Sequence, residues 1–175
     1  MYVNRGKYKG TLIKGYENAS TRATASRVYD SLFDYLSPYI KDASVLDLFA
    51  GTGQLGITAL SMGAKEAIFN DFDKGAFQNI KDNLNAIKVN TLVMNFDYEK
   101  ALTFLNLKKS KFDLIFLDPP YSKINIDNII SKLINLNLLN DKAIIVVETD
   151  EDLSLNYRLL NHKNYGYKKI YIYEI

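Results

Sequence analysis

From residue 44 onward, short β-branched and aromatic runs alternate with longer amphipathic stretches, and this alternation leaves few folds open to the chain. The apolar runs predict strands at residues 45–49, 66–71, 91–96, 112–117 and 143–147. The stretches between them predict helices at residues 54–62, 74–87, 99–107 and 126–135, and the tail predicts a closing hairpin from 157–160 and 169–173. Such alternation indicates an α/β fold, a mainly parallel sheet with helices on both faces.

The residues ahead of this pattern are different in character. Apolar side chains recur at i, i+4 and i+8 over residues 28–36, which predicts an amphipathic helix that packs on the sheet. Thr24 or Ser26 is expected to cap this helix, and Pro38 is expected to end it. The basic stretch before the helix, residues 8–14, has a strand-like composition.

Composition narrows the class of protein further. A chain of 175 residues with 47% hydrophobic content fits one domain, with an arm and helix over residues 1–40 and a core over 44–175. No apolar run approaches 18 residues and no cleavable signal is evident, so a cytoplasmic protein is expected. The chain has no cysteine and one histidine, His162, which excludes disulfides and Cys nucleophiles and argues against a metal site or a Ser-His-Asp triad.

Positive charge is concentrated near the N-terminus. Over residues 1–29 six basic side chains face a single acid, a local net charge of +5. The basic residues are Arg5, Lys7, Lys9, Lys14, Arg22 and Arg27. Such a segment fits a phosphate-contacting arm and a solvated surface equally well, so both interpretations stay open.

A glycine-rich turn follows the first predicted strand of the core. Gly51-Thr52-Gly53-Gln54-Leu55-Gly56 fits Gly-x-Gly-x-x-Gly, which lets backbone approach a nucleotide at a helix N-terminus but also suits a dinucleotide. Asp47 lies within the strand, where a carboxylate could hold a water or the ammonium group of an amino-acid cofactor. Asp71 ends the second strand, where a carboxylate could bind two ribose hydroxyls.

Further residues at strand ends extend this predicted nucleotide site. Phe72 and Phe96 could enclose an adenine, and Asp97 could hydrogen-bond it, although aromatic residues at strand ends are often part of the core. Asp73 is expected to cap the helix that follows it. Because three successive strands end in carboxylates, we expect these groups to converge on one crevice.

The strand predicted at residues 112–117 ends in Asp118-Pro119-Pro120-Tyr121. Carboxylate and carbonyl oxygens at such a turn can accept both hydrogens of an exocyclic amine, while the ring stacks on the base. Combined with the glycine-rich turn, this motif is typical of S-adenosylmethionine-dependent amino-methyltransferases.

The chain also resembles a known family over nearly its whole length, the bacterial small-subunit ribosomal RNA guanine-N2 methyltransferases. The resemblance rests on the catalytic-type motif at 118–121, the cofactor-type motif at 46–53, the helix around 56–64 and N-terminal patterns at 7–10, 21–24, 27–28 and 32–33. The family usually has Pro where this chain has Ala23, which concerns the geometry of an RNA-binding loop. Asp71 replaces the more usual Glu, an equivalent group for binding ribose.

The resemblance implies a Rossmann-like class I methyltransferase with a seven-stranded sheet and a C-terminal hairpin. It implies methyl transfer from S-adenosylmethionine to a guanine N2 amine of 16S rRNA in the assembling small subunit, without membrane or metal. The implied catalytic residues are Asp118, Pro119, Pro120 and Tyr121. The implied cofactor contacts are Asp47, Phe49, Ala50, Gly51, Thr52, Gly53, Asp71, Phe72, Phe96, Asp97 and Asp118. The implied RNA contacts are Lys7, Lys9, Arg22, Thr24 and Arg27.

Three other classes of protein share part of this pattern. DNA adenine-N6 methyltransferases carry the same tetrapeptide, but they normally have a sequence-reading domain for which this chain has no room. Protein amine and amide methyltransferases resemble an Asn-Pro-Pro-Tyr pattern instead. A non-enzymatic nucleotide-binding module, or an NAD oxidoreductase, explains the glycine-rich turn but leaves residues 118–121 without a role.

Overall fold

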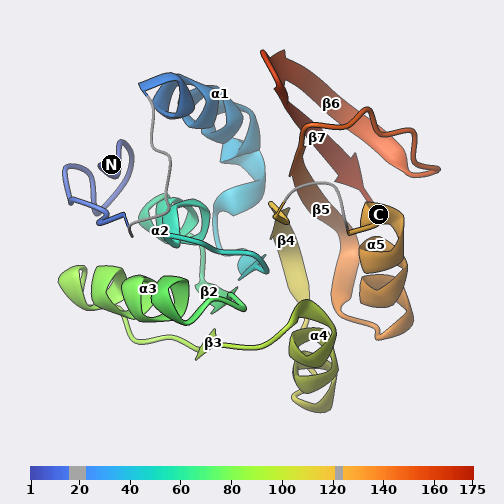
Figure 1. Ribbon diagram of the computed structural model, residues 1–175, viewed down its shortest axis with the longest axis horizontal. Coiled ribbons are helices and arrows are strands. Elements are labelled where there is room, and N and C mark those ends of the chain that lie inside the picture. The colour runs from blue at the N-terminus through green and yellow to red at the C-terminus, as the bar shows by residue number, and fades with distance from the viewer. Residues whose placement is uncertain (16–22, 121–123) are drawn as a thin grey trace.

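A computed structural model describes residues 1–15, 23–120 and 124–175, and for 23–27 the backbone alone. One seven-stranded sheet forms its centre, with strand order β3-β2-β1-β4-β5-β7-β6 (Figure 1). The first five strands are parallel, whereas β7 is antiparallel to both β5 and β6. The strands are β1 Ser44–Asp47, β2 Glu66–Asn70, β3 Val93–Met94, β4 Phe112–Leu117, β5 Leu139–Thr149, β6 Arg158–Tyr165 and β7 Lys168–Glu174. The predicted seven-stranded α/β sheet with a closing hairpin is confirmed.

Helices cover both faces of the sheet. They are α1 Ala23–Ile40, α2 Gln54–Ser61, α3 Lys74–Ala86, α4 Tyr98–Leu107 and α5 Ile126–Asn135. Side chains alternate along each strand, so Leu114 and Phe116 of β4 pack with α1, α2 and α3, while Ile115 and Leu117 pack with α4 and α5. This two-sided burial explains the nearly continuous apolar runs of the parallel strands. Among the described residues, no helix is long and apolar enough to cross a membrane.

Helix α1 packs on the sheet as predicted, but its predicted ends are wrong. Thr24 and Ser26 lie inside the helix, which includes Ala23, so neither residue is a cap. Pro38 does not end the helix, which continues to Ile40. A proline in the last turn removes only one helical hydrogen bond, and the complete burial of the Ile40 side chain stabilises that turn.

Three predicted strands differ clearly in length, among them β6, which runs from Arg158 to Tyr165 where the sequence predicted 157–160. Strand β3 is confined to Val93–Met94, shorter than the predicted 91–96, and β5 extends from Leu139 to Thr149 beyond the predicted 143–147. The additional N-terminal residues of β5 are half-buried or exposed, so hydrophobicity alone did not reveal them. Residues 8–14 form a turn followed by an isolated bridge between Tyr2 and Leu12, in place of the strand-like segment.

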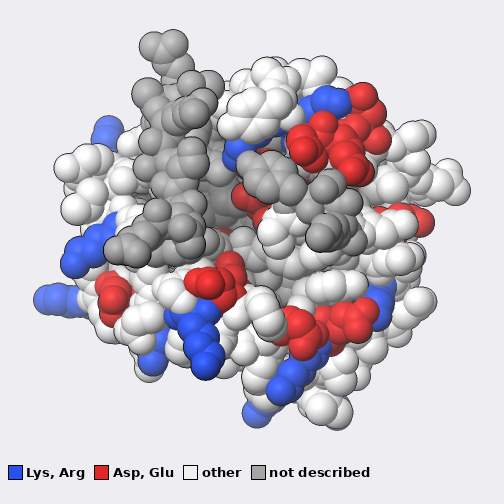
Figure 2. Space-filling model, in the orientation of Figure 1, with Lys and Arg blue, Asp and Glu red and all other residues white. Residues whose placement is uncertain are grey.

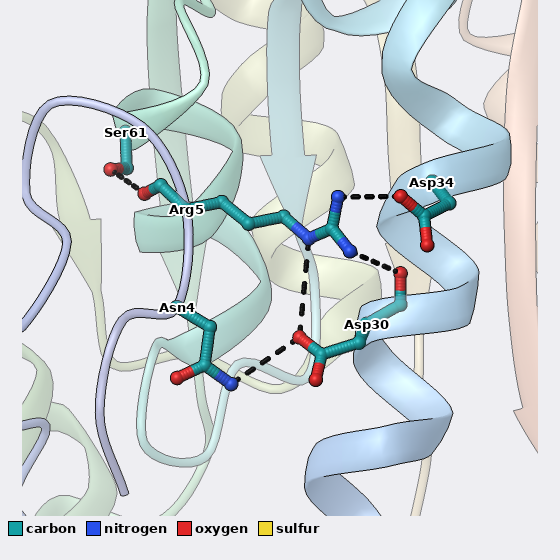
Figure 3. Close-up of polar contacts among 5 residues, drawn as sticks. All are labelled: Asn4, Arg5, Asp30, Asp34 and Ser61. Carbon is teal, nitrogen blue, oxygen red and sulfur yellow. Dashed lines mark hydrogen bonds and ion pairs between the residues drawn. The ribbon is translucent and has the colours of Figure 1, made fainter.

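Hydrogen bonds and ion pairs connect the N-terminal loop to α1 and α2 (Figure 3). The Arg5 guanidinium donates to Asp34 Oδ1 at 2.6 Å and to the carbonyl oxygen of Asp30 at 3.1 Å. The Asn4 amide donates to Asp30 Oδ1 at 3.3 Å, and the Ser61 hydroxyl of α2 donates to the Arg5 carbonyl oxygen. The positive charge of Arg5 is therefore neutralised by carboxylates of α1. Arg5 connects the N-terminal loop to α1, and its guanidinium is not a free cation of the basic arm.

Candidate functional site

A cleft of about 1000 Å³ lies at the carboxyl ends of the parallel strands. In the space-filling view carboxylates gather around the central hollow (Figure 2). The predicted site residues that line it are Phe49, Gly51, Asp71, Phe72, Asp97, Asp118, Pro119 and Pro120. The glycine-rich turn and the Asp-Pro-Pro segment, 67 residues apart in the sequence, thus face one cavity.

Asp71 holds the glycine-rich turn at the floor of this cleft. Gly51 has a φ of 54°, and its N–H donates to Asp71 Oδ2 at 2.8 Å. The other oxygen, Oδ1, accepts from the N–H of Asp73 at 2.9 Å. Since a carboxylate offers about four acceptor positions, each oxygen keeps one for a ligand hydroxyl. Burial raises the pKa of Asp71, against the lowering effect of these two N–H groups.

Asp47 and Gly56 support the turn from behind. Asp47 is 2% exposed, and its Oδ2 accepts from the N–H of Gly56 at 2.9 Å. Burial raises the pKa of Asp47 to about 7, with the Gly56 N–H opposing and the charges of Asp118 and Asp71 adding to the rise. A Cβ at Gly56 would lie 2.3 Å from the Phe69 ring, so this glycine allows close helix–sheet packing. Asp47 is not among the described lining residues, and neither are Ala50, Thr52 and Gly53.

The ends of β2 and β3 contribute unequally to the cleft. Phe72 is 77% exposed beside Asp71, where a planar ligand can stack on its ring. Phe96 instead packs against Phe104, with ring centroids 5.9 Å apart, and is not among the described lining residues. Asp97 lines the cleft while it caps α4, accepting from the N–H of Lys100 at 2.9 Å.

Of the caps predicted from the sequence, the one at Asp73 is confirmed. Asp73 accepts from the N–H of Ala76 at 2.8 Å and begins α3.

Asp118 stands at the end of β4, followed by Pro119 and Pro120 on the cleft wall. Burial raises the pKa of Asp118 to about 6, Lys168 lowers it and Asp71 raises it further. Asp118 is therefore a carboxylate above pH 6 and protonates in mildly acidic solution. Tyr121 lies outside the described residues, and its stacking role stays a prediction.

Three residues near Asp118 were missed by the sequence analysis. Glu148, at the end of β5, forms an ion pair with the Lys168 ammonium and accepts from the Tyr29 hydroxyl at 3.3 Å. Glu148 directly follows the apolar run at 143–147, the same signal that marked Asp118, and could have been found that way. Lys168 and Tyr29 do not follow an apolar run that would mark them in the sequence. The register of β7 on β5 brings Lys168 to Glu148, and the packing of α1 on the sheet brings Tyr29 there.

The predicted RNA-contacting residues lie away from this cluster or outside the described part of the chain. Lys7 and Lys9 are exposed on the N-terminal loop, and the Lys7 ammonium lies 5.3 Å from the Tyr8 ring centroid. Arg22 lies outside the described residues, as do the side chains of Thr24 and Arg27. The RNA-contacting role of all five stays a prediction.

Negative charge dominates the described lining of the cleft. Eight carboxylates face one ammonium, that of Lys168. The carboxylates are Asp71, Asp73, Asp97, Asp118, Asp127, Glu148, Asp150 and Glu151. This charge balance favours a cationic ligand and disfavours a pyrophosphate in the cleft.

The sheet order with its antiparallel closing strand is that of the class I methyltransferase fold. The model of the family described as Conserved hypothetical protein 95 matches residues 1–174, so the chain belongs to that family. Ribosomal RNA small subunit methyltransferase D of Haemophilus influenzae is 34% identical over 175 residues, which cover 97% of this chain and 91% of that protein. The family resemblance seen in the sequence is confirmed, and the family is one of S-adenosylmethionine-dependent rRNA methyltransferases.

Solved structures agree with this placement. "Putative methyltransferase yhhF" from Escherichia coli superposes with a TM-score of 0.87 at 30% identity, covering 99% of this chain and 97% of that one. A 16S rRNA methyltransferase of Thermus thermophilus, solved in complex with AdoMet and guanosine, has a TM-score of 0.65 at 20% identity. The match covers 91% of this chain and 44% of that one, and shows a shared fold.

Proposed function

We propose that this protein methylates the exocyclic N2 amine of a guanine in 16S rRNA, using S-adenosylmethionine, on the assembling small subunit in the cytoplasm. The observation that carries the proposal is that Asp118, Pro119 and Pro120 share one cleft with the Gly51 turn and Asp71. The amine-orienting motif and the nucleotide-type turn are thus close enough to serve two substrates at once.

The described residues of the cleft suit S-adenosylmethionine. Asp71 has free acceptor positions for two ribose hydroxyls, and exposed Phe72 offers a ring for the adenine. The surplus of carboxylates attracts a cofactor that carries a sulfonium and an ammonium, and it argues against NAD, whose pyrophosphate is anionic. When bound, the cofactor supplies an electrophilic methyl group.

Asp118 orients the amine for attack on that methyl group. A guanine amine is a weak nucleophile because its lone pair is delocalised into the ring. Hydrogen bonds from the amine to Asp118 and to the Pro119 carbonyl fix its hydrogens and direct the lone pair toward the methyl carbon, and this positioning lowers the barrier. Positive charge that develops on the nitrogen is stabilised by the same oxygens. The methylated ammonium is acidic enough to release its proton to solvent, so no strong base is needed.

The experiment that tests this function begins with 16S rRNA from a strain that lacks the gene. Mass spectrometry should find one N2-methylguanosine lost in that strain and restored by the wild-type gene. Small-subunit particles from the same strain should accept labelled methyl from S-adenosylmethionine when the purified protein is added. If every N2-methylguanosine persists in the deletion strain, or label appears only on adenine, the proposal is wrong.

A further inference from the structure

Glu148 and Asp118 occupy equivalent positions on neighbouring parallel strands. The last registered pair between β4 and β5 is Leu117 with Val147, so Asp118 and Glu148 follow side by side. Phe116 and Val146 belong to the cluster that contacts α1, and residues two apart share a face of a sheet. Both carboxyl groups therefore point to the α1 side of the same cleft.

Glu148 is 6% exposed and is held from two directions. Its register partner on β7 is Ile170, so Lys168, two residues away, lies on the same face and pairs with Oε1. The hydroxyl of Tyr29 on α1 donates to Oε2 at 3.3 Å. A carboxylate accepts about four hydrogen bonds, so each oxygen keeps acceptor capacity toward the cleft. A buried carboxylate with two fixed partners is oriented before any ligand arrives.

This cluster complements the base-pairing edge of guanine. Across the sheet the groups run from Asp118, an acceptor, to Glu148, an acceptor, to Lys168, a donor. The guanine edge runs from the N2 amine, a donor, to N1–H, a donor, to O6, an acceptor. Adenine presents an acceptor at N1 beside its amine, and that nitrogen would face the Glu148 carboxylate without a proton between them.

On the basis of the proposed function, we propose that Glu148, with Lys168 beside it, binds N1–H and O6 of the target guanine and selects guanine over adenine. Asp118 then orients the reacting amine, and Glu148 identifies the base that carries it. Tyr29 is a positioning residue, since it acts through Glu148.

The test compares guanine with 2-aminopurine, which keeps the 2-amine but has an acceptor at N1 and lacks O6. Small subunits are reconstituted with either base at the modified position, found beforehand by mass spectrometry. The wild-type protein should methylate 2-aminopurine with kcat/KM about 10- to 100-fold lower, the usual effect of losing a hydrogen bond to a charged group. In Glu148→Gln the amide can donate to N1 of 2-aminopurine, so the guanine rate should fall and the ratio of the two rates should approach one.

Glu174→Gln is the matched control. Glu174 also pairs with a basic side chain of the closing hairpin, Arg158, but it is not among the described cleft residues. This variant should keep the wild-type ratio of guanine to 2-aminopurine rates. Melting temperature and S-adenosylhomocysteine affinity verify that each variant is folded.

The outcomes separate this inference from the proposed function. If the wild-type protein methylates both bases equally well, or if Glu148→Gln keeps the wild-type ratio, Glu148 does not select the base although the proposed function stands. Even if Glu148→Gln fails to fold, equal rates of the wild-type protein on the two bases would rule out the inference. If the wild-type protein methylates neither base, and also fails on particles from the deletion strain, the proposed function itself is wrong.

Discussion

The two halves of the cleft are built by different means. On the side proposed to bind the cofactor, at the ends of β1, β2 and β3, carboxylates are fixed by backbone N–H groups, as Asp71 is by Gly51 and Asp73. On the side proposed to bind the substrate, at the ends of β4 and β5, the carboxylate is held by other side chains, as Glu148 is held by Tyr29 and Lys168. The first half depends on backbone conformation and the second on a balance of charge. Substitutions should therefore affect the two halves in different ways.

The largest effect is expected on the substrate side. Asp118→Ala should lower the turnover of methyl transfer by about 100-fold or more while S-adenosylmethionine affinity stays near wild type, since the lost oxygen acts on the amine in the transition state. Asp118→Asn should lose less, because its amide oxygen still accepts a hydrogen bond. Single-turnover methylation of small-subunit particles, with calorimetric cofactor binding alongside, measures both effects. A near wild-type rate for Asp118→Ala would remove the amine-orienting role.

On the cofactor side, two glycines of one motif should fail differently. Gly51 has positive φ and open space where a Cβ would be, so Gly51→Val should place a side chain in the cofactor's path and abolish measurable binding. In Gly56→Ala the new Cβ meets the Phe69 ring, so we expect a stability loss of about 1–3 kcal/mol. Calorimetry and denaturant unfolding on both variants test this contrast. Equal losses of affinity and of stability in both would show that the motif acts as one unit.

A smaller effect is expected when Lys168 is replaced, on the pH dependence of the methyl-transfer rate. If Asp118 acts as proposed, methyl transfer is fastest with its carboxylate form, so the rate should rise with pH through about 6 and then level off. Lys168 lowers this pKa, so Lys168→Met should raise it and move the midpoint of the rate profile to higher pH. In this variant Asp118 keeps its other titratable neighbours, which are Asp47, Asp71, Glu148 and Tyr29. Single-turnover rates from pH 5 to 9 test this, and an unchanged midpoint would show that Lys168 has no influence on Asp118.

The last prediction concerns how the stability of the fold depends on pH through Asp47, behind the Gly51 turn. The pKa of Asp47 is about 7 in the folded protein and near 4 in an unfolded chain, so folding favours its protonated form and stability falls as pH rises between these values. Asp47→Asn avoids this loss and can still accept from the Gly56 N–H. Its melting temperature should exceed that of wild type at pH 8 by more than at pH 5. Exposed Asp141→Asn is the control and should show no such trend, and a constant difference for Asp47→Asn would contradict the linkage.

The same contrast explains what the sequence could predict. Apolar runs and amphipathic periods are local, and they located β4 and α5 at the residues where the structure has them. The Gly51 turn and the Asp73 cap follow rules of local backbone geometry, and Asp71 has the spacing from Gly51 that is typical of a nucleotide-binding βαβ unit. Their convergence with Asp118 on one edge follows from parallel strand order, which the alternating pattern already implied.

What the sequence did not reveal depends on tertiary contacts that no local sequence pattern specifies. Pro38 is tolerated within α1 because Ile40 is buried against the rest of the fold. Phe96 follows a strand, where a ring could stack on a ligand. In the structure its ring packs instead against Phe104 of α4, at the edge of the hydrophobic core. Lys168 reaches Glu148 only because β7 pairs with β5 in one particular antiparallel register, which no local pattern fixes.

The position of β7 within the sheet has a consequence for how the protein is made. β7 follows every other strand in the chain, yet it lies between β5 and β6, so the edge of β5 stays unpaired until the ribosome has synthesised residues 168–174. During translation that apolar edge is exposed to other nascent chains, and sheet completion waits for a non-local pairing. Because Lys168 belongs to this strand, the charge balance around Asp118 is completed only after β7 has been synthesised and has paired with β5.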